Sequence, residues 1–142
     1  MNKNRFEHYK TGIDFIDEEH WELFELLNKV EEFRKTDPIK AQMYLRHFKD
    51  ASYRHTKDED NMMKQIGFPY SHVHENVHNT KCLNVDCFLG DKLLPAKFDI
   101  SNIPVRDLIY YLAKHIDEQD MQYVPFYKAW EEEMLLKDKH GS

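Results

Sequence analysis

The chain has 142 residues, 41% of them hydrophobic, with four glycines, five prolines and a formal net charge of −6 at pH 7. These values predict one compact helical domain over residues 1–142 and disfavour a β-sandwich or a disordered chain. The acidic balance without a basic cluster disfavours nucleic acid and anionic membranes as partners, and no apolar run approaches the ~20 residues of a membrane span.

Four amphipathic helices and a short fifth one are predicted from apolar residues that recur three and four positions apart. Residues 1–16 are expected to form an extended arm before them. Asp17 is expected to cap the first helix, and an aspartate followed by Pro38 is typical of the start of the second. Gly67 and Pro69 predict a tight corner after the second helix. The expected helices cover residues 18–36, 38–65, 71–89, 104–123 and, in the tail, 126–136.

Helices of this length joined by mostly short connections predict an all-α, up-down-up-down four-helix bundle. Phe126, Trp130 and Met134 of the tail helix are expected to pack back onto it. Cys82 and Cys87 are five residues apart and would point to different sides of one helix, so we expect free thiols rather than a disulfide. No signal peptide is evident, so the protein is expected in the cytoplasm. No protein partner is evident from the sequence.

Seven polar side chains fall on the inner faces of these helices, among apolar residues. His74 and His78 are four residues apart, as are His55 and Glu59, so each pair shares one helix face. A lone histidine on such a face is usually a hydrogen-bonded core residue, but seven polar groups in one interior are hard to satisfy by hydrogen bonds alone. A metal centre would satisfy them together. The candidate ligands are His20, His55, Glu59, His74, His78, His115 and Asp120, while the remaining histidines, expected at the surface, are His8, His47, His72 and His140.

The number and type of these side chains indicate the metal. Five imidazoles and two carboxylates exceed the four ligands of a zinc ion, and calcium and magnesium prefer oxygen ligands. A pair of iron ions suits mixed nitrogen and oxygen ligands, and each carboxylate can bridge the two ions. Five histidines then divide as three and two. If a small oxide or hydroxide also bridges the two ions, one metal has six ligands and the other five, which leaves one open coordination position at a single metal.

The ordered motifs of the chain resemble those of the hemerythrin family, in its stand-alone bacterial form. They cover residues 11–123 nearly end to end. The motifs are Thr11-Gly12-Ile13-Asp14-Phe15-Ile16-Asp17-Glu18-Glu19-His20 with Leu23-Phe24, His55-x3-Glu59-x3-Met63, Gly67-Phe68-Pro69, His74-x3-His78 and His115-Ile116-x3-Asp120-x2-Tyr123.

This resemblance implies a non-heme di-iron centre, with two iron ions joined by an oxide or hydroxide bridge, that binds O2 reversibly as a carrier, store or sensor. It implies that Glu59 and Asp120 bridge the irons and that O2 binds at the iron with fewer histidines. One iron would be held by His74, His78 and His115, and the other by His20 and His55. A non-enzymatic role is therefore expected. The alternative is a di-iron enzyme or sensor that handles peroxide or nitric oxide.

Apolar residues near the expected site would exclude water from bound O2. Leu23 and Phe24 follow His20 on the first helix, and Leu112 lies one turn before His115. These three are the predicted O2 pocket. Tyr111 offers a competing account, because its hydroxyl would bring a proton donor close to the site.

The spacing of the last two ligands predicts an irregular helix. His115 and Asp120 are five residues apart, so a regular α-helix places them ~140° apart around its axis. Both side chains can face one site if the helix opens locally into an i→i+5 turn, or if it presents one ligand from each flank of its inner face. We expect a local irregularity between Leu112 and Asp120.

Overall fold

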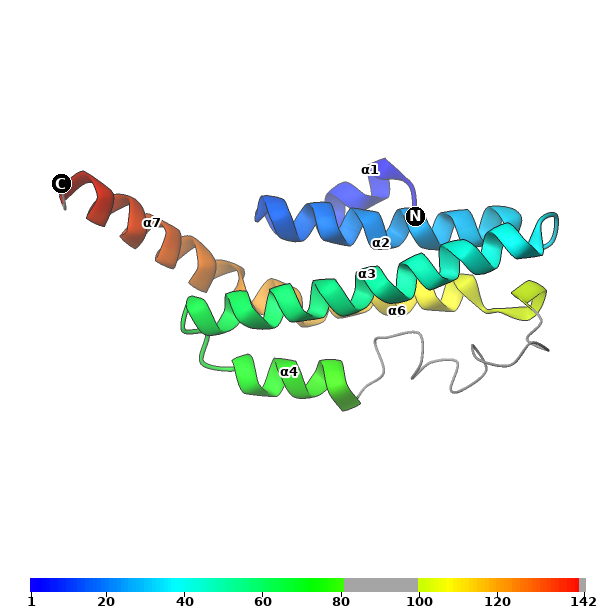
Figure 1. Cartoon of the computed structure of the whole chain (residues 1–142). Helices are drawn as coiled ribbons and strands as arrows, with labels where there is room; N and C mark the ends of the chain where they lie inside the picture. The colour runs from blue at the N-terminus through cyan, green and yellow to red at the C-terminus, as the bar shows by residue number, and fades with distance from the viewer. Residues whose placement is uncertain (81–99, 141–142) are drawn as a thin grey trace.

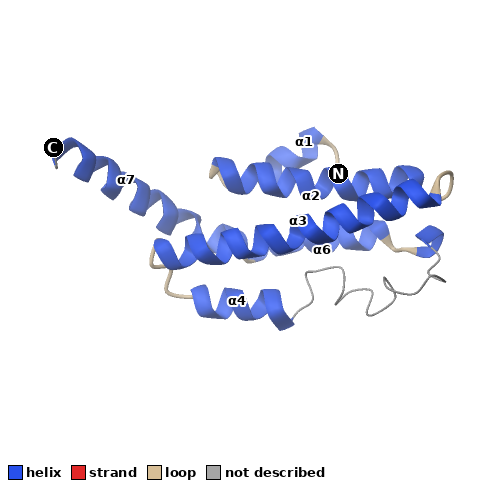
Figure 2. Ribbon diagram, viewed as in Figure 1, coloured by secondary structure: helices blue, strands red, loops and turns tan. Residues whose placement is uncertain are grey.

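The computed structural model describes residues 1–80 and 100–140, apart from the side chains of residues 78–80 and 140. Four helices run alternately in opposite directions and lie along one another (Figure 1). They are α2 (Asp14–Phe33), α3 (Pro38–Gln65), α4 (Ser71–Thr80) and α6 (Val105–Glu118). The predicted all-α bundle is confirmed, and the described ranges contain no strand (Figure 2).

The first bundle helix begins four residues earlier than the sequence predicts. α2 starts at Asp14, so Asp17 lies inside the helix instead of capping it. The Asp17 carboxylate accepts hydrogen bonds from the Thr11 amide and hydroxyl, both at 2.8 Å, and from the Gly12 amide at 3.1 Å. Gly12 has φ +83°, a backbone conformation that favours glycine. Asp17 therefore fixes the turn that leads the chain into α2.

The second helix has the predicted bounds. The Asp37 carboxylate accepts a hydrogen bond from the Lys40 amide at 3.2 Å, and Pro38 occupies the first helical position, where no amide hydrogen is needed. The corner after α3 is also confirmed, with Gly67 at φ +70°. The third predicted helix, 71–89, is described as far as Thr80, and its continuation, with Cys82 and Cys87, lies outside the described residues.

The N-terminal arm is not extended as predicted. Residues 3–9 form two short helical elements, α1 (Lys3–Phe6) and η1 (Glu7–Tyr9). The Asn2 side chain accepts a hydrogen bond from the Arg5 amide at 2.8 Å and so caps the first. Phe6 is buried, with its ring 5.1 Å from Trp21 and 5.8 Å from Phe24. This packing fastens the arm to α2.

The tail helix is longer than predicted and mostly does not pack back. α7 (Val124–His140) leaves the end of the bundle and points away from it (Figure 1). Phe126 contacts the Phe68 ring at 5.2 Å, and Trp130 is half-buried beside Tyr127 of its own helix. Met134 is exposed, so that part of the prediction is wrong. None of the helices described here combines the length and the apolar character needed to cross a membrane.

A polar layer divides the core of the bundle. One apolar cluster includes Leu23 and another includes Ile16, at different depths of the bundle. Along α2, His20 lies between these two residues, and His55 and Glu59 take the corresponding place along α3. Burial of charged groups in a core costs several kcal/mol unless partners compensate, so this layer requires partners of opposite charge.

Candidate metal centre

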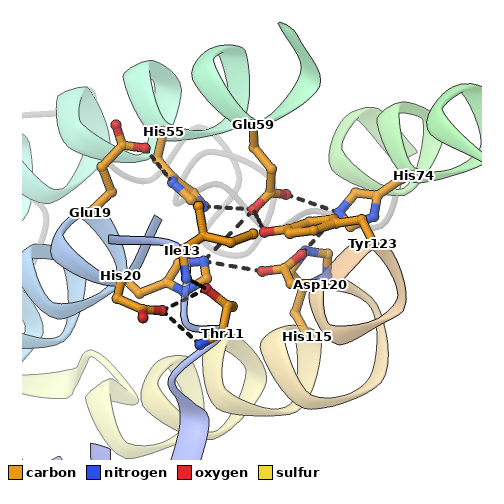
Figure 3. A network of polar contacts seen from close by, with 11 residues as sticks. Thr11, Ile13, Glu19, His20, His55, Glu59, His74, His115, Asp120 and Tyr123 are labelled. Atoms are coloured by element: carbon orange, nitrogen blue, oxygen red, sulfur yellow. Dashed lines mark hydrogen bonds and ion pairs between the residues drawn. The ribbon is translucent and has the colours of Figure 1, made fainter. Parts of the chain in front are cut away.

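Six of the seven predicted ligands converge in the polar layer, and they come from five different elements (Figure 3). All six side chains are buried. His78 belongs to α4, four residues after His74, but its side chain lies outside the described part of the chain. The converging residues are His20 of α2, His55 and Glu59 of α3, His74 of α4, His115 of α6 and Asp120 of η4 (Asp120–Tyr123).

Glu59 directs its two oxygens to opposite sides of the centre. Its Oε2 lies 3.2 Å from Nε2 of His55 and 3.7 Å from Nε2 of His20. Its Oε1 lies 2.9 Å from Nε2 of His74. The carboxylate thus lies between histidines of α2 and α3 on one side and a histidine of α4 on the other.

Asp120 divides its oxygens in the same way. Its Oδ2 lies 3.1 Å from Nε2 of His20. Its Oδ1 lies 3.0 Å from Nε2 of His74 and 3.0 Å from Nε2 of His115. Both carboxylates therefore offer one oxygen to each of two sets of histidines.

The ligand atoms form two overlapping groups, and within each group all of them lie within 4.8 Å of one another. Both groups contain Glu59 and Asp120. Two metal ions that share two carboxylates require this pattern, because a bridging carboxylate gives one oxygen to each ion. The groups are His20, His55, Glu59, Asp120 and Glu59, His74, His115, Asp120.

A break in the last bundle helix brings Asp120 to the centre. The α-helical part of α6 ends at Glu118, and the chain continues through Gln119 into the 3₁₀ turn η4. The Gln119 amide still donates to the His115 carbonyl at 2.8 Å, so the regular pattern holds up to that point. An irregularity is present, but it lies at the helix end as a tighter 3₁₀ turn, so the i→i+5 turn expected within the helix is wrong.

The carboxylates raise the pKa values of His20, His55 and His74. Burial lowers the pKa of His55, but the charge of Glu59 and hydrogen bonds to Glu19 and Glu59 outweigh it and raise the pKa to about 10. Burial also lowers the pKa of His74, and hydrogen bonds to Asp120 and Glu59 raise it to about 9. The pKa of His20 is raised as well, against burial, by Asp120 and Glu59.

The histidines in turn lower the pKa values of both carboxyl groups. Burial raises the pKa of Glu59, but the charge of His55 and hydrogen bonds from the surrounding histidines hold it well below the usual range. For Asp120, burial and the Glu59 charge raise the pKa, and the contacts with His115 and His20 prevail and lower it. Both carboxylates therefore stay ionised at neutral pH, the form that binds metal.

Glu19 contributes to the centre, although its place in the sequence does not indicate this. Its Oε1 lies 2.8 Å from Nδ1 of His55, on the side of the ring away from Glu59. A carboxylate only accepts hydrogen bonds, so this contact holds the proton on Nδ1 and leaves Nε2 facing the centre. Burial raises the pKa of the Glu19 carboxyl, and the hydrogen bond to His55 opposes that rise.

Tyr123 is the second group whose role the sequence leaves undefined. Its side chain is fully buried, and its hydroxyl donates a hydrogen bond to Oε2 of Glu59 at 3.0 Å. Burial, followed by the charges of Glu59 and Asp120, raises the pKa of the hydroxyl well above its usual value. Tyr123 thus remains protonated and holds the orientation of the Glu59 carboxylate.

The predicted pocket residues occupy the core in different ways. Leu23 and Phe24 are buried, and Leu112 is half-buried against two apolar clusters. Tyr111 is 51% exposed, beside the ring of Tyr110 on the outer side of α6. Leu112, the next residue, faces the core, and successive side chains of an α-helix point about 100° apart. The Tyr111 side chain is therefore directed away from the core, and it does not bring a hydroxyl to the centre.

Three of the four histidines predicted at the surface lie there, and the fourth has a side chain outside the described residues. His8, His47 and His72 are exposed, which confirms that they belong to a different class from the buried set. The side chain of His140 lies outside the described residues. His72 and His74 differ in burial although they share α4, so position on the helix face separates them.

An all-helical bundle whose interior brings histidines and carboxylates into two overlapping ligand groups is a metal-binding bundle. The family model described as "Hemerythrin HHE cation binding domain" matches residues 11–127. The chain therefore belongs to the hemerythrin family.

Relatives of known name support this assignment. A bacteriohemerythrin of Campylobacter jejuni is 29% identical over 122 residues, covering 81% of this chain and 87% of that protein. A bacteriohemerythrin of Clostridium acetobutylicum is 25% identical and covers 82% of this chain and 94% of its own length. Hemerythrin subunit alpha of Lingula reevii is 26% identical over 82% of this chain and 88% of its own. No solved structure matches the chain at a significant level.

Proposed function

We propose that this protein binds O2 reversibly at a pair of iron ions, as a carrier, store or sensor. The observation that carries the proposal is that Glu59 and Asp120 each direct one carboxylate oxygen toward each of the two ligand groups. Their donor chemistry fits iron, because imidazole nitrogens and carboxylate oxygens together are typical of non-heme iron sites. One ion would be bound by His20 and His55, and the other by His74, His78 and His115.

The iron pair would supply the two electrons that O2 takes up on binding and returns on release. The protein supplies the charge balance, since the two ionised carboxylates offset part of the charge of the metal ions. Glu19 keeps the proton of His55 on Nδ1, and Tyr123 orients Glu59, so the ligand atoms point inward. We assign Leu23, Phe24 and Leu112 to excluding water near the group with fewer histidines.

Metal analysis and an optical spectrum test the proposal together. We expect two irons per chain, and a visible charge-transfer band that appears with O2 and disappears when O2 is removed, over repeated cycles. His74→Ala should lose iron, whereas His72→Ala, which removes an exposed histidine from the same helix, should retain it. One zinc and no iron from iron-replete cells would contradict the metal assignment.

The alternative, turnover of peroxide or nitric oxide, is tested on the same iron-loaded protein. A carrier or store should survive many oxygenation cycles and consume little peroxide. Irreversible oxidation on first contact with O2, without the charge-transfer band, would refute reversible binding and favour an enzyme or a redox sensor.

A further inference from the structure

A partly open cavity of about 460 Å³ lies between the N-terminal arm, α2 and α6, and we call it the arm pocket. Four residues of α6 line it, and their spacing of three, four and seven positions places them on one helix face. They are Arg106, Ile109, Tyr110 and Ala113. Among the described residues that line the pocket, none is a candidate metal ligand. The volume is typical of small-molecule sites, which span about 300–1,000 Å³.

The arm that forms one wall of the pocket is fastened along its length. It lies beside α2 (Figure 1), where the Met1 amino group donates to Oδ1 of Asn28 at 3.0 Å and Nδ2 of Asn28 donates to the Met1 carbonyl at 2.6 Å. Phe6 is buried, and Tyr9 packs against the same apolar cluster as Ala113. The pocket is therefore formed before any ligand arrives, so that binding does not have to order a loop.

The pocket presents positive charge that the described part of the chain does not balance. Arg5 and Arg106 both line it, and neither guanidinium has a hydrogen-bond or ion-pair partner among the described residues. Burial, followed by the charge of Arg5, lowers the pKa of the Met1 amino group, so these positive groups lie close together. Glu31 is the acidic residue in the described lining, and Arg34 occupies both of its oxygens, at 2.8 and 3.4 Å. In a chain of net charge −6, such a concentration of positive charge attracts an anion locally.

The pocket also has an aromatic part, and its charge changes along its length. Tyr9 and Tyr110 line it, and they also line a second cavity of about 230 Å³ that continues along α6. Lys114, Asp117 and Glu118 line this continuation, which is therefore net acidic. An anionic group is favoured at the arginine end, whereas the tyrosine rings between the two ends offer flat surfaces to an apolar group.

We propose that the arm pocket binds a small organic anion, with a carboxylate or phosphate head at Arg5 and Arg106 and a flat apolar body against Tyr9 and Tyr110. Guanidinium groups present paired N–H donors that match both kinds of head. Because the arginines are exposed, added salt should weaken the binding. This inference concerns a site apart from the metal centre and does not depend on iron or on O2 binding.

Isothermal titration calorimetry of the full chain, with benzoate and phenyl phosphate as probes, tests the proposal. At least one of them should bind with a Kd on the order of 0.1–1 mM, and the tighter of the two identifies the preferred head. Benzamide has the same ring without the charge, and inorganic phosphate has the charge without the ring. Each should bind at least about tenfold more weakly than the tighter probe.

Substitutions locate the binding in the arm pocket. Arg5→Gln and Arg106→Gln should each weaken binding of the tighter probe at least about tenfold. Arg46→Gln is the matched control, because it removes the same charge from an exposed position on α3 that does not line the pocket, and it should leave the affinity unchanged. All three arginines are exposed, so the helical circular dichroism should be the same in every variant.

Four results would overturn the proposal. They are an absence of saturable binding of either probe up to about 10 mM, binding of benzamide or inorganic phosphate as tight as that of the tighter probe, and equal losses of affinity in Arg46→Gln and Arg106→Gln, which would indicate long-range charge alone. The fourth is a change in the visible spectrum of iron-loaded protein as the probe binds, which would place the anion at the iron.

Discussion

Removal of the metal should make the stability of this protein fall as the pH rises above neutrality. The pKa of His55 is raised from 6.5 to about 10 and that of His74 from 6.5 to about 9, because each ring faces buried carboxylates. Between these values and pH 6.5 the folded chain holds protons that the unfolded chain has released. The stabilising contribution is therefore fully present below pH 6.5 and is lost as the pH rises through 9 and 10.

The size of the effect follows from the pKa shifts. The pKa of His74 moves from 6.5 to about 9, a shift of about 2.5 units that corresponds to roughly 3 kcal/mol. The shift of His55 is larger, but both rings interact with Glu59, so the two contributions are not additive. A loss of roughly 3 kcal/mol is a large part of a typical stability of about 5–15 kcal/mol. It should lower the urea midpoint by roughly 1–3 M.

Urea unfolding of chelator-treated protein at a series of pH values, followed by far-ultraviolet circular dichroism, measures this effect. His74→Gln should make the fall with pH shallower, and His72→Gln, at an exposed position two residues away, should leave it unchanged. Iron-loaded protein should show little dependence, because ring nitrogens bound to metal cannot hold protons. A urea midpoint of the metal-free protein that stays flat or rises between pH 6.5 and 9 would refute the reasoning.

Three substitutions test other parts of the centre. Tyr123→Phe should lower the free energy of unfolding by about 1–3 kcal/mol, because Glu59 loses a buried hydrogen-bond donor, and urea unfolding measures this. Glu19→Ala should weaken iron binding about 10–100-fold, because the His55 ring loses the contact that orients it. Competition with a chelator measures the iron affinity, and the affinity of Glu19→Gln should lie between those of Glu19→Ala and the parent protein. Leu112→Ala should speed autoxidation, which is measured as the decay of the oxygenated spectrum. The iron content should stay near two per chain, and the free energy of unfolding should fall by no more than about 2–5 kcal/mol.

Each substitution has a control of similar size. Tyr110→Phe, at a 62% exposed position on α6, should leave stability unchanged, and equal losses in both variants would refute a specific role for Tyr123. Glu18→Ala removes an exposed carboxylate next to Glu19 and should leave iron affinity at the parent value. Leu26→Ala removes another half-buried leucine from the same apolar cluster as Leu112. Equal autoxidation rates in the two leucine variants would refute the water-excluding role.

Much of the candidate centre was predictable because helix faces repeat in sequence. Spacings of three and four residues place His20 with Leu23 and Phe24, and His55 with Glu59, without knowledge of the neighbouring helices. The same periodicity separated the buried histidines from the exposed ones. The convergence of these faces on one layer then follows from the bundle topology.

The contacts of Glu19 and Tyr123 could not be predicted in this way, because they depend on how distant segments pack. Glu19 meets His55 across 36 positions of sequence, and Tyr123 meets Glu59 across 64. The position of Asp120 likewise depends on the end of α6 at Glu118, which no spacing rule defines. The projection of α7 was missed because its apolar residues resemble those of a packed helix, and sequence alone does not tell which surface they meet.

Under the proposed metal assignment, the buried centre would accept either protons or metal ions in the same place. Two ionised carboxylates in a core require positive charge nearby. In the metal-free chain the protonated Nε2 of His55 provides some of it, 3.2 Å from Glu59, while Nδ1 is held by Glu19. A metal ion would replace the proton on Nε2 and leave the Nδ1 contact intact, so the ring keeps its orientation. Protons therefore hold these side chains close to the positions that the proposed metal ions would require, and they would compete with metal for the same nitrogen atoms.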